Sequence, residues 1–163
     1  MPLIANITHF ILETNQAYHI KKQYICNKKT TMDLTGILNI SGKAGLFKVI
    51  STGKKNIIVE SLDDKKRIPL HKNLNANMLE EIGIYTYNET IPLKEVFEKI
   101  AKKENGKQTI THKTIEHELI NYFRDIIKDY DEERVYISNI RKVIQWYNSI
   151  QKAGLIKKEK KKT

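Results

Sequence analysis

Residues 36–50 read GILNISGKAGLFKVI, and this stretch indicates a β-hairpin. Two apolar runs, residues 36–40 and 46–50, flank a short segment that contains two glycines. Glycine readily adopts the left-handed backbone conformation that tight turns require. Further apolar runs over residues 57–61 and 67–70 are separated by turn-forming residues. The sequence therefore predicts four meandering antiparallel strands.

The segment that follows predicts closure of this meander. Residues 75–81 predict a single helical turn, and residues 82–87, IGIYTY, predict a fifth strand whose side chains alternate between two faces. Four strands, a helical turn and a short fifth strand are typical of an SH3-like small barrel. A β-meander without closure is the alternative that the pattern leaves open. Pro69 lacks a backbone donor, so its strand is expected to be short or to lie at an edge.

From Thr90 onward the spacing of apolar residues is helical. Thr90 is the predicted N-cap of a first helix that ends before Asn105. A second helix is predicted over residues 113–128. A third begins with Ser138 as N-cap and ends at Gly154.

These elements predict an α+β fold in two parts. An N-terminal SH3-like five-stranded β-barrel covers residues 32–88, and a three-helix unit covers residues 89–156. The link between them is short and a barrel of this size is marginally stable alone, so the helices are expected to pack against it.

The net charge of +10 divides unevenly along the 163 residues. Residues 1–31 hold four Lys and one Glu, and residues 157–163 hold five Lys and one Glu. The 125 residues between them hold 20 basic and 17 acidic side chains. The texture of the sequence also changes at Met32. We therefore expect residues 1–31 to be a disordered extension, or to lie upstream of a true start at Met32, and residues 157–163 to be a solvated basic tail.

The composition predicts a soluble, cytoplasmic protein. Cys26 is the only cysteine, which excludes an intrachain disulfide and a zinc site of several thiolates and suits a reducing compartment. No apolar run approaches the roughly 20 residues that cross a bilayer, so no membrane partner is expected.

Several strings together resemble a known family. They are the stretch from Met32 to Lys48, the segment VESLDD at 59–64, PLKEVF at 92–97, YDEERVY at 130–136, and WYN at 146–148. In these strings the chain resembles an uncharacterised-domain family, a domain of unknown function that is common in Bacteroidetes. The resemblance covers residues 32–156. It implies that the protein begins at the equivalent of Met32, and it implies no activity.

Motifs for catalysis and cofactors fail on spacing. Residues 36–43 contain Gly and Gly-Lys, but five residues intervene where a phosphate-binding loop needs four, and no Ser or Thr follows Lys43. His112 and His117 are five residues apart, which places them on different sides of a helix. We therefore predict no catalytic residues, no cofactor and no metal site, and a binding function rather than an enzymatic one.

The densest acidic cluster is Asp129, Asp131, Glu132 and Glu133, which lacks the spacing and the glycine of an EF-hand. An ion at this loop is an alternative left open. In the favoured interpretation Glu132 and Glu133 are solvated or are paired with a basic neighbour, which is Arg134, Arg141 or Lys142. It also packs Tyr130 and Tyr136 onto the helices.

Candidate binding residues combine basic and aromatic side chains, as nucleic-acid-binding small barrels do. On the barrel they are Lys43, Phe47, Lys54, Lys55, Lys65, Lys66, Arg67 and Tyr85. Lysine-rich turns also protect sheet edges from aggregation, which is the non-functional interpretation and the favoured one.

The third helix adds Arg141, Gln145 and Trp146 to these candidates. Arg141 and Gln145 begin a polar stripe that continues through Asn148 and Lys152. Such a stripe suits a DNA groove, but a solvent-facing side of the helix is favoured.

The resulting hypothesis is a non-enzymatic nucleic-acid-binding or RNA–protein-associated module. Its contact with RNA or DNA is expected to be weak and salt-sensitive, because most of the net charge lies near the two ends. The alternative is an adaptor that binds a protein partner through the barrel or the third helix.

Overall fold

The computed structural model describes residues 30–71 and 75–158. Residues Thr30–Lys157 form one compact unit. The fold is mixed α+β, as predicted. The predicted N-terminal extension lies outside the described residues up to position 29, and so does the basic tail beyond Lys158.

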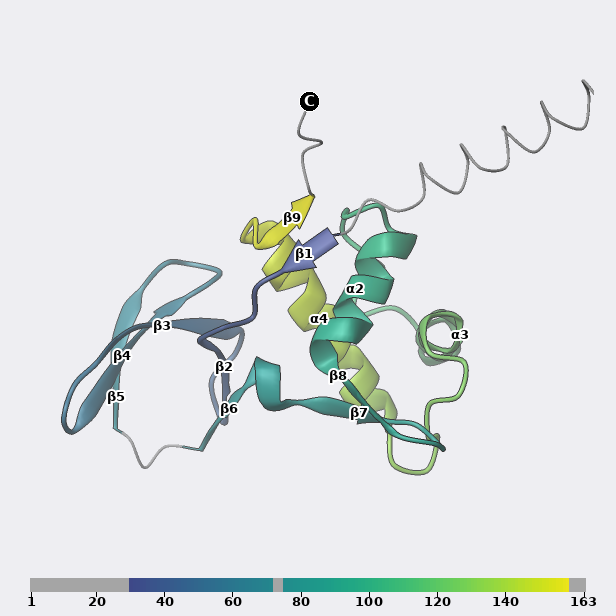
Figure 1. The fold of residues 1–163 in the computed structure, drawn as a ribbon, viewed down its shortest axis with the longest axis horizontal. Helices are drawn as coiled ribbons and strands as arrows, with labels where there is room; N and C mark the ends of the chain where they lie inside the picture. Colours follow the sequence, from purple (N-terminus) through teal and green to yellow (C-terminus); the bar gives the residue numbers. More distant parts are fainter. Residues whose placement is uncertain (1–29, 72–74, 159–163) are drawn as a thin grey trace, which may run out of the picture. The chain divides into compact units, whose positions relative to one another are not determined.

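A five-stranded antiparallel sheet dominates the N-terminal part of the fold (Figure 1). Its strands have the spatial order β5-β4-β3-β2-β6. Their bounds are Ile37–Ile40 for β2, Leu46–Thr52 for β3, Asn56–Ser61 for β4, Arg67–His71 for β5 and Ala76–Met78 for β6. The four predicted meander strands are thus confirmed, and Pro69 lies in the edge strand β5.

The register sorts the sheet's side chains onto two faces. Leu38 pairs with Phe47, and Val49 pairs with Val59. Side chains on a strand alternate, so these residues share one face with the apolar residues of β5 and β6. Five members of this face form a separate buried cluster, here called the sheet core: Leu38, Ile40, Phe47, Val59 and Leu70.

The predicted closure into a barrel is wrong in its fifth strand. Residues 82–87 do not join the sheet; Gly83–Tyr85 (β7) pairs instead with Thr90–Pro92 (β8) in a separate hairpin. The fifth place belongs to β6, which pairs with β2. The β7 and β8 strands are neighbours along the chain, so their pairing closes a short loop at low entropic cost. The sheet is therefore not closed into a barrel: β2 to β5 form a four-strand meander, and β6 returns to pair with β2 at its other edge.

Three α-helices and a short 3₁₀ turn complete the fold. The turn η1 spans Leu79–Glu81, and the helices are α2 (Leu93–Lys103), α3 (Glu116–Ile126) and α4 (Ile137–Lys152). A two-stranded pairing joins β1 (Thr30–Met32) to β9 (Ile156–Lys158).

Two predicted helix N-caps are wrong. Thr90 lies in β8, and Pro92, whose ring presets an extended entry, precedes α2 instead. Ser138 lies inside α4, whose first residue is Ile137 and whose N-cap is Tyr136. The backbone N–H of Tyr136 donates to Asn139 Oδ1 at 3.1 Å. Gly154, with φ of +72°, ends α4 as predicted.

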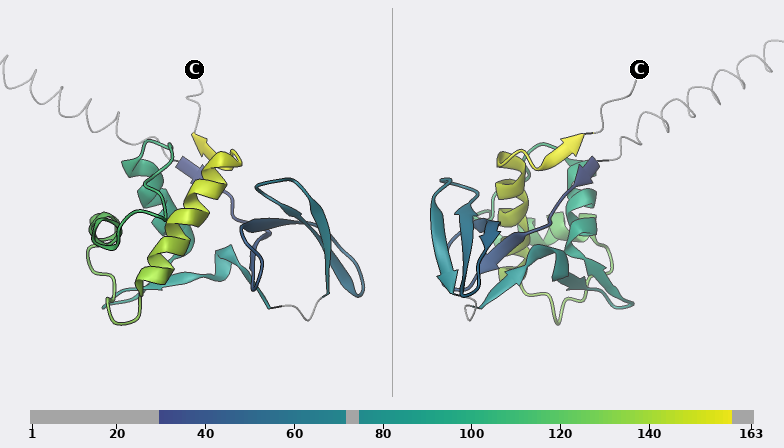
Figure 2. Two further views of the ribbon diagram at one scale, coloured as in Figure 1. Left: turned by 180° about the vertical axis from the view of Figure 1, so that it is seen from behind. Right: turned by 60° about the vertical axis from the view of Figure 1, so that its left-hand side comes forward.

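The main core lies among the helices and extends to the sheet. Phe97 of α2 and Tyr147 of α4 are fully buried, with ring centroids 6.0 Å apart, where the two helices cross (Figures 1 and 2). The same cluster includes Ile37 and Leu46, which lie on the sheet face opposite the sheet core. The sheet therefore contributes to two hydrophobic cores, one on each face.

No helix in the described ranges is long and apolar enough to cross a membrane.

Candidate functional site

The predicted basic residues of the sheet are divided between its two ends. The β2–β3 turn carries Lys43, and the β4–β5 segment carries Lys65 to Arg67; both connections lie at one end of the sheet. A Cβ added to Gly45 in the first turn would lie 2.7 Å from Asp63 Oδ2 in the second, so the two turns touch. Lys54 and Lys55 lie in the β3–β4 turn at the opposite end.

Ion pairs neutralise part of this charge. The Arg67 guanidinium contacts Glu60 at 2.9 Å, and the Lys66 ammonium contacts Asp64 at 3.2 Å. Within the described ranges, the other exposed cations of the sheet have no carboxylate at ion-pair distance; they are Lys43, Lys48, Lys54, Lys55 and Lys65. Lys48 was not among the predicted residues. It pairs with Ile37 on the face opposite the sheet core, and the alternation of side chains after Phe47 is the signal that could have placed it there.

Phe47 is not part of any exposed binding surface. Only 6% of the residue is exposed, because it belongs to the sheet core. The pattern of the strand made it look like a surface aromatic residue, but its partner across the ladder is the buried Leu38. The predicted combination of lysines with Phe47 on one surface is therefore wrong.

The polar stripe of α4 holds a connection inside the fold instead of facing solvent along its length. Arg141 Nη1 donates to the carbonyls of His112 and Thr114. Asn148 Oδ1 accepts from the Thr109 backbone at 2.9 Å, and its amide nitrogen donates to the Ile110 carbonyl at 3.0 Å. These side chains fasten the α2–α3 connection to α4, which occupies groups that a DNA contact needs.

The aromatic residues of α4 are likewise structural. Tyr147 is fully buried and donates from its hydroxyl to the Lys107 carbonyl at 3.0 Å. Burial raises the pKa of Tyr147 to about 12. Trp146 is half-buried and packs against the main core, and Gln145 is also half-buried.

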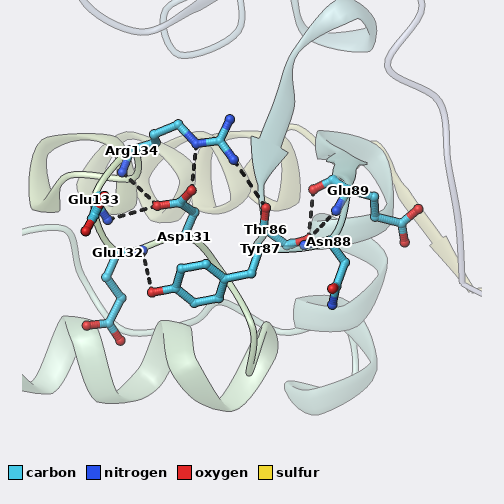
Figure 3. A network of polar contacts seen from close by, with 8 residues as sticks. All are labelled: Thr86, Tyr87, Asn88, Glu89, Asp131, Glu132, Glu133 and Arg134. Carbon is cyan, nitrogen blue, oxygen red and sulfur yellow. Dashed lines mark hydrogen bonds and ion pairs between the residues drawn. The ribbon is translucent and has the colours of Figure 1, made fainter.

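A polar network joins the β7–β8 hairpin to the loop before α4 (Figure 3). The Asp131 backbone donates to the Tyr85 carbonyl at 3.0 Å, and the Tyr87 backbone donates to the Asp129 carbonyl at 3.1 Å. Thr86 and Tyr130 form a β-bridge between these two bonds. Tyr130 is buried and packs edge-on against Phe123, as predicted.

Side chains strengthen the same junction. Asp131 Oδ2 accepts from the Arg134 side chain at 2.6 Å, while Oδ1 accepts from the backbones of Glu133 and Arg134. The bond from Arg134 is the main cause that lowers the pKa of Asp131 below its usual value. The Arg134 guanidinium also donates to the Thr86 carbonyl at 3.4 Å, as Figure 3 shows.

The ion pairs of the acidic loop differ from the predicted ones, whereas Glu133 is exposed, which fits the solvated alternative. Glu132 contacts Arg124 at 2.7 Å, and Arg134 pairs with Asp131. Tyr136, which was expected to pack onto the helices, is 65% exposed. Within residues 30–71 and 75–158, no three His, Cys, Asp or Glu side chains are grouped so that they could hold a metal ion.

Two tyrosines of the hairpin are exposed beside this network. Tyr85 is 45% exposed and Tyr87 is 64% exposed, while Thr86 between them is buried. The Arg134 guanidinium lies 4.4 Å from the centre of the Tyr85 ring. Tyr85 was predicted to be a binding residue of the barrel. It lies in the β7–β8 hairpin, which is separate from the five-stranded sheet.

The comparisons divide the chain near residue 80. A family model described as Domain of unknown function (DUF5606) matches residues 34–79. A second, Domain of unknown function (DUF6852), matches residues 82–150. A solution NMR structure from Bacteroides vulgatus, a Northeast Structural Genomics Consortium target, is 41% identical with a TM-score of 0.64. That match covers 77% of this chain and 90% of the other. No curated protein matches the sequence.

Charge also divides at this boundary. Residues 34–79 contain eight Lys and Arg against three Asp and Glu, a net charge of +5. Residues 82–150 contain eleven of each, a net charge of zero. The surplus of positive charge between the two ends of the chain therefore belongs to the sheet.

Proposed function

The chain belongs to the Bacteroidetes family that joins DUF5606 to DUF6852, and on that premise we propose that it binds nucleic acid through its sheet. The contact is electrostatic, weak and salt-sensitive, and the protein acts as a non-enzymatic module. The main support for this proposal is the uneven charge of the two parts. Residues 34–79 have a net charge of +5, whereas residues 82–150 have a net charge of zero.

The arrangement of the lysines supports contact with a phosphate backbone rather than with bases. Four of the five exposed cations that have no carboxylate partner in the described ranges lie at the ends of the sheet, and the fifth, Lys48, lies within β3. The four are Lys43, Lys54, Lys55 and Lys65. Flexible ammonium groups attract phosphates as point charges, and contacts to phosphates carry no sequence information by themselves. No exposed aromatic residue accompanies them, since Phe47 is buried. The proposed binding therefore has little sequence preference.

Two finer parts of the proposal concern the fold and the location. We propose that the open sheet is related to the SH3-like barrel, which its four-strand meander supports, together with β6 and the η1 turn that come after it. We also propose a cytoplasmic location, which the single cysteine supports. Fractionation of cells that produce a tagged chain tests the location.

The test is fluorescence anisotropy of the full chain with a labelled single-stranded RNA and with duplex DNA. If about three phosphates of RNA are bound, affinity falls about twentyfold between roughly 50 and 200 mM salt. Replacing Lys43 and Lys65 by Gln should weaken binding. A plot of the logarithm of the association constant against the logarithm of the salt concentration should also become less steep. Its slope should change by about 0.7 for each RNA phosphate that is no longer neutralised. Replacing Lys54 and Lys55 tests the opposite end.

The matched control replaces two exposed lysines of α2 by Gln, in the variant Lys94→Gln with Lys102→Gln. Both belong to residues 82–150, whose net charge is zero. A further variant replaces Lys160, Lys161 and Lys162 by Gln. If only that variant loses affinity, the sheet does not bind nucleic acid and the proposal fails. It also fails if neither RNA nor DNA binds at low salt.

A further inference from the structure

Tyr87 offers an aromatic face that the fold itself leaves open. Its neighbour Tyr85 already carries a guanidinium, because Arg134 lies over that ring at 4.4 Å. Tyr87 lies two residues further along, on the same exposed side as Tyr85, and is more exposed, at 64% against 45%. Within the described ranges, no cation lies over the Tyr87 ring.

The backbone around Tyr87 is held in place before any partner arrives. Its N–H donates to the Asp129 carbonyl, and its hydroxyl accepts from the Glu132 backbone at 3.5 Å. The Thr86 hydroxyl accepts from the backbones of Asn88 and Glu89, which shapes the turn at the tip of the hairpin. Figure 3 shows the bonds of the Tyr87 hydroxyl and of the Thr86 hydroxyl. A pre-ordered ring loses little conformational entropy on binding.

The charge around this ring specifies the sign of a partner. Residues 124–134 contain Arg124, Lys128 and Arg134 against five carboxylates. One of these carboxylates, Asp125, pairs with Lys103 of α2 at 2.9 Å, so four cations face five carboxylates and the local net charge is −1. Glu89, at the tip of the hairpin, is exposed and adds a further negative charge. This surface repels phosphates, so it does not suit the nucleic acid proposed for the sheet. It attracts a cation, and a guanidinium stacks on tyrosine better than an ammonium does.

We propose that Tyr87, together with the carboxylates of Asp129 and Glu133 in the loop that bonds to its backbone and hydroxyl, is a docking surface for an arginine of a partner protein. The partner's guanidinium lies over the Tyr87 ring, as that of Arg134 lies over Tyr85. Tyr and Arg are the side chains that most often dominate protein interfaces. This surface is separate from the sheet, so it does not depend on nucleic-acid binding.

The probe is a synthetic glycine-rich peptide with two arginines, compared with versions that carry two lysines or two glutamates. NMR titration of the full chain follows the backbone amides. The arginine peptide should shift amides at residues 85–89 and 129–134, and it should bind about threefold or more tightly than the lysine peptide. The glutamate peptide should leave these amides unmoved.

Variants separate the ring from the charge. Tyr87→Ala should weaken arginine-peptide binding about tenfold, whereas Tyr87→Phe keeps the ring and most of the affinity. Asp129→Asn with Glu133→Gln should weaken it severalfold. Glu116→Gln with Glu118→Gln removes the same charge from exposed positions of α3 and should have no effect.

Three results would overturn the proposal. One is equal binding of the arginine and lysine peptides, which shows charge attraction without stacking. Another is a Tyr87→Ala variant that binds the arginine peptide as tightly as the parent chain does, while its other amide signals show that it is folded. The third is a single-stranded RNA that shifts the same hairpin amides, which makes this surface a nucleic-acid site.

Discussion

Residues 34–79 and residues 82–150 use their polar side chains in different ways. In the sheet, most cations lie in turns at the two ends, and only Lys66 and Arg67 have ion-pair partners in the described ranges. In the helical part, long polar side chains fasten segments together, as Arg141 and Asn148 do for the α2–α3 connection. The sheet therefore keeps its charge available to a partner, and the helical part consumes much of its polar capacity internally.

The hydrophobic cores differ in the same direction. The sheet core consists of residues from one face of one sheet. The main core gathers α2, α3 and α4 and also takes in Ile37 and Leu46 from the other face. The helical part thus supports the sheet, and damage to it should affect both parts, which the following substitutions test.

The largest effect is expected in the main core. Phe97→Ala removes a fully buried ring that packs against Tyr147 and should cost about 3–5 kcal/mol of unfolding free energy. Ile40→Ala in the sheet core should cost about 2–4 kcal/mol. Chemical denaturation that follows Trp146 fluorescence, together with far-ultraviolet circular dichroism, measures both. Separate transitions for sheet and helices in Phe97→Ala would contradict the shared core.

The next effect concerns the clamp on the α2–α3 connection. Asn148→Ala leaves a backbone donor and a backbone acceptor of residues 109–110 without their partner, and it should cost about 1–3 kcal/mol. Asn121→Ala, at an exposed position of α3, is the control and should stay within about 0.5 kcal/mol. Thermal unfolding compares the two. Equal losses would mean that the clamp contributes nothing specific.

Two glycines allow the contact between sheet turns to be isolated. Gly42 and Gly45 have φ angles of +78° and +83°, so an alanine at either strains the backbone by about 1–2 kcal/mol. A Cβ at Gly42 meets open space, whereas one at Gly45 lies 2.7 Å from Asp63 Oδ2. Gly45→Ala should therefore be the more destabilising of the two in urea unfolding. A smaller loss at Gly45 would show that Asp63 moves aside freely.

The smallest effect is expected at the hairpin junction and depends on pH. The pKa of Asp131 is lowered in the folded protein, mainly by its bond from Arg134, so the stabilisation is present above the unfolded pKa of about 3.9. It is lost as the pH falls through the folded pKa. Asp131→Asn should therefore lower the unfolding free energy near neutral pH and approach the parent chain in strong acid. A constant difference between pH 7 and 2 would contradict this assignment.

Local signals predicted much of the fold and little of the candidate site. The four meander strands and the three helices followed from glycine-containing turns and helical spacing of apolar residues. The partner of residues 82–87 could not be read, because an alternating strand suits any neighbouring edge. Phe47 shows the same limit, since its burial depends on which face of the sheet becomes a core.

The sequence by itself determined the α+β class, the boundaries of most elements and the sum of charges in each part. These depend on residues close together along the chain and on composition. Only the tertiary structure decided that the meander stays open, that Arg141 and Asn148 of α4 bind a loop, and that Tyr87 stands exposed beside carboxylates. Each of these depends on contacts between distant segments, where burial and pairing outweigh local preference.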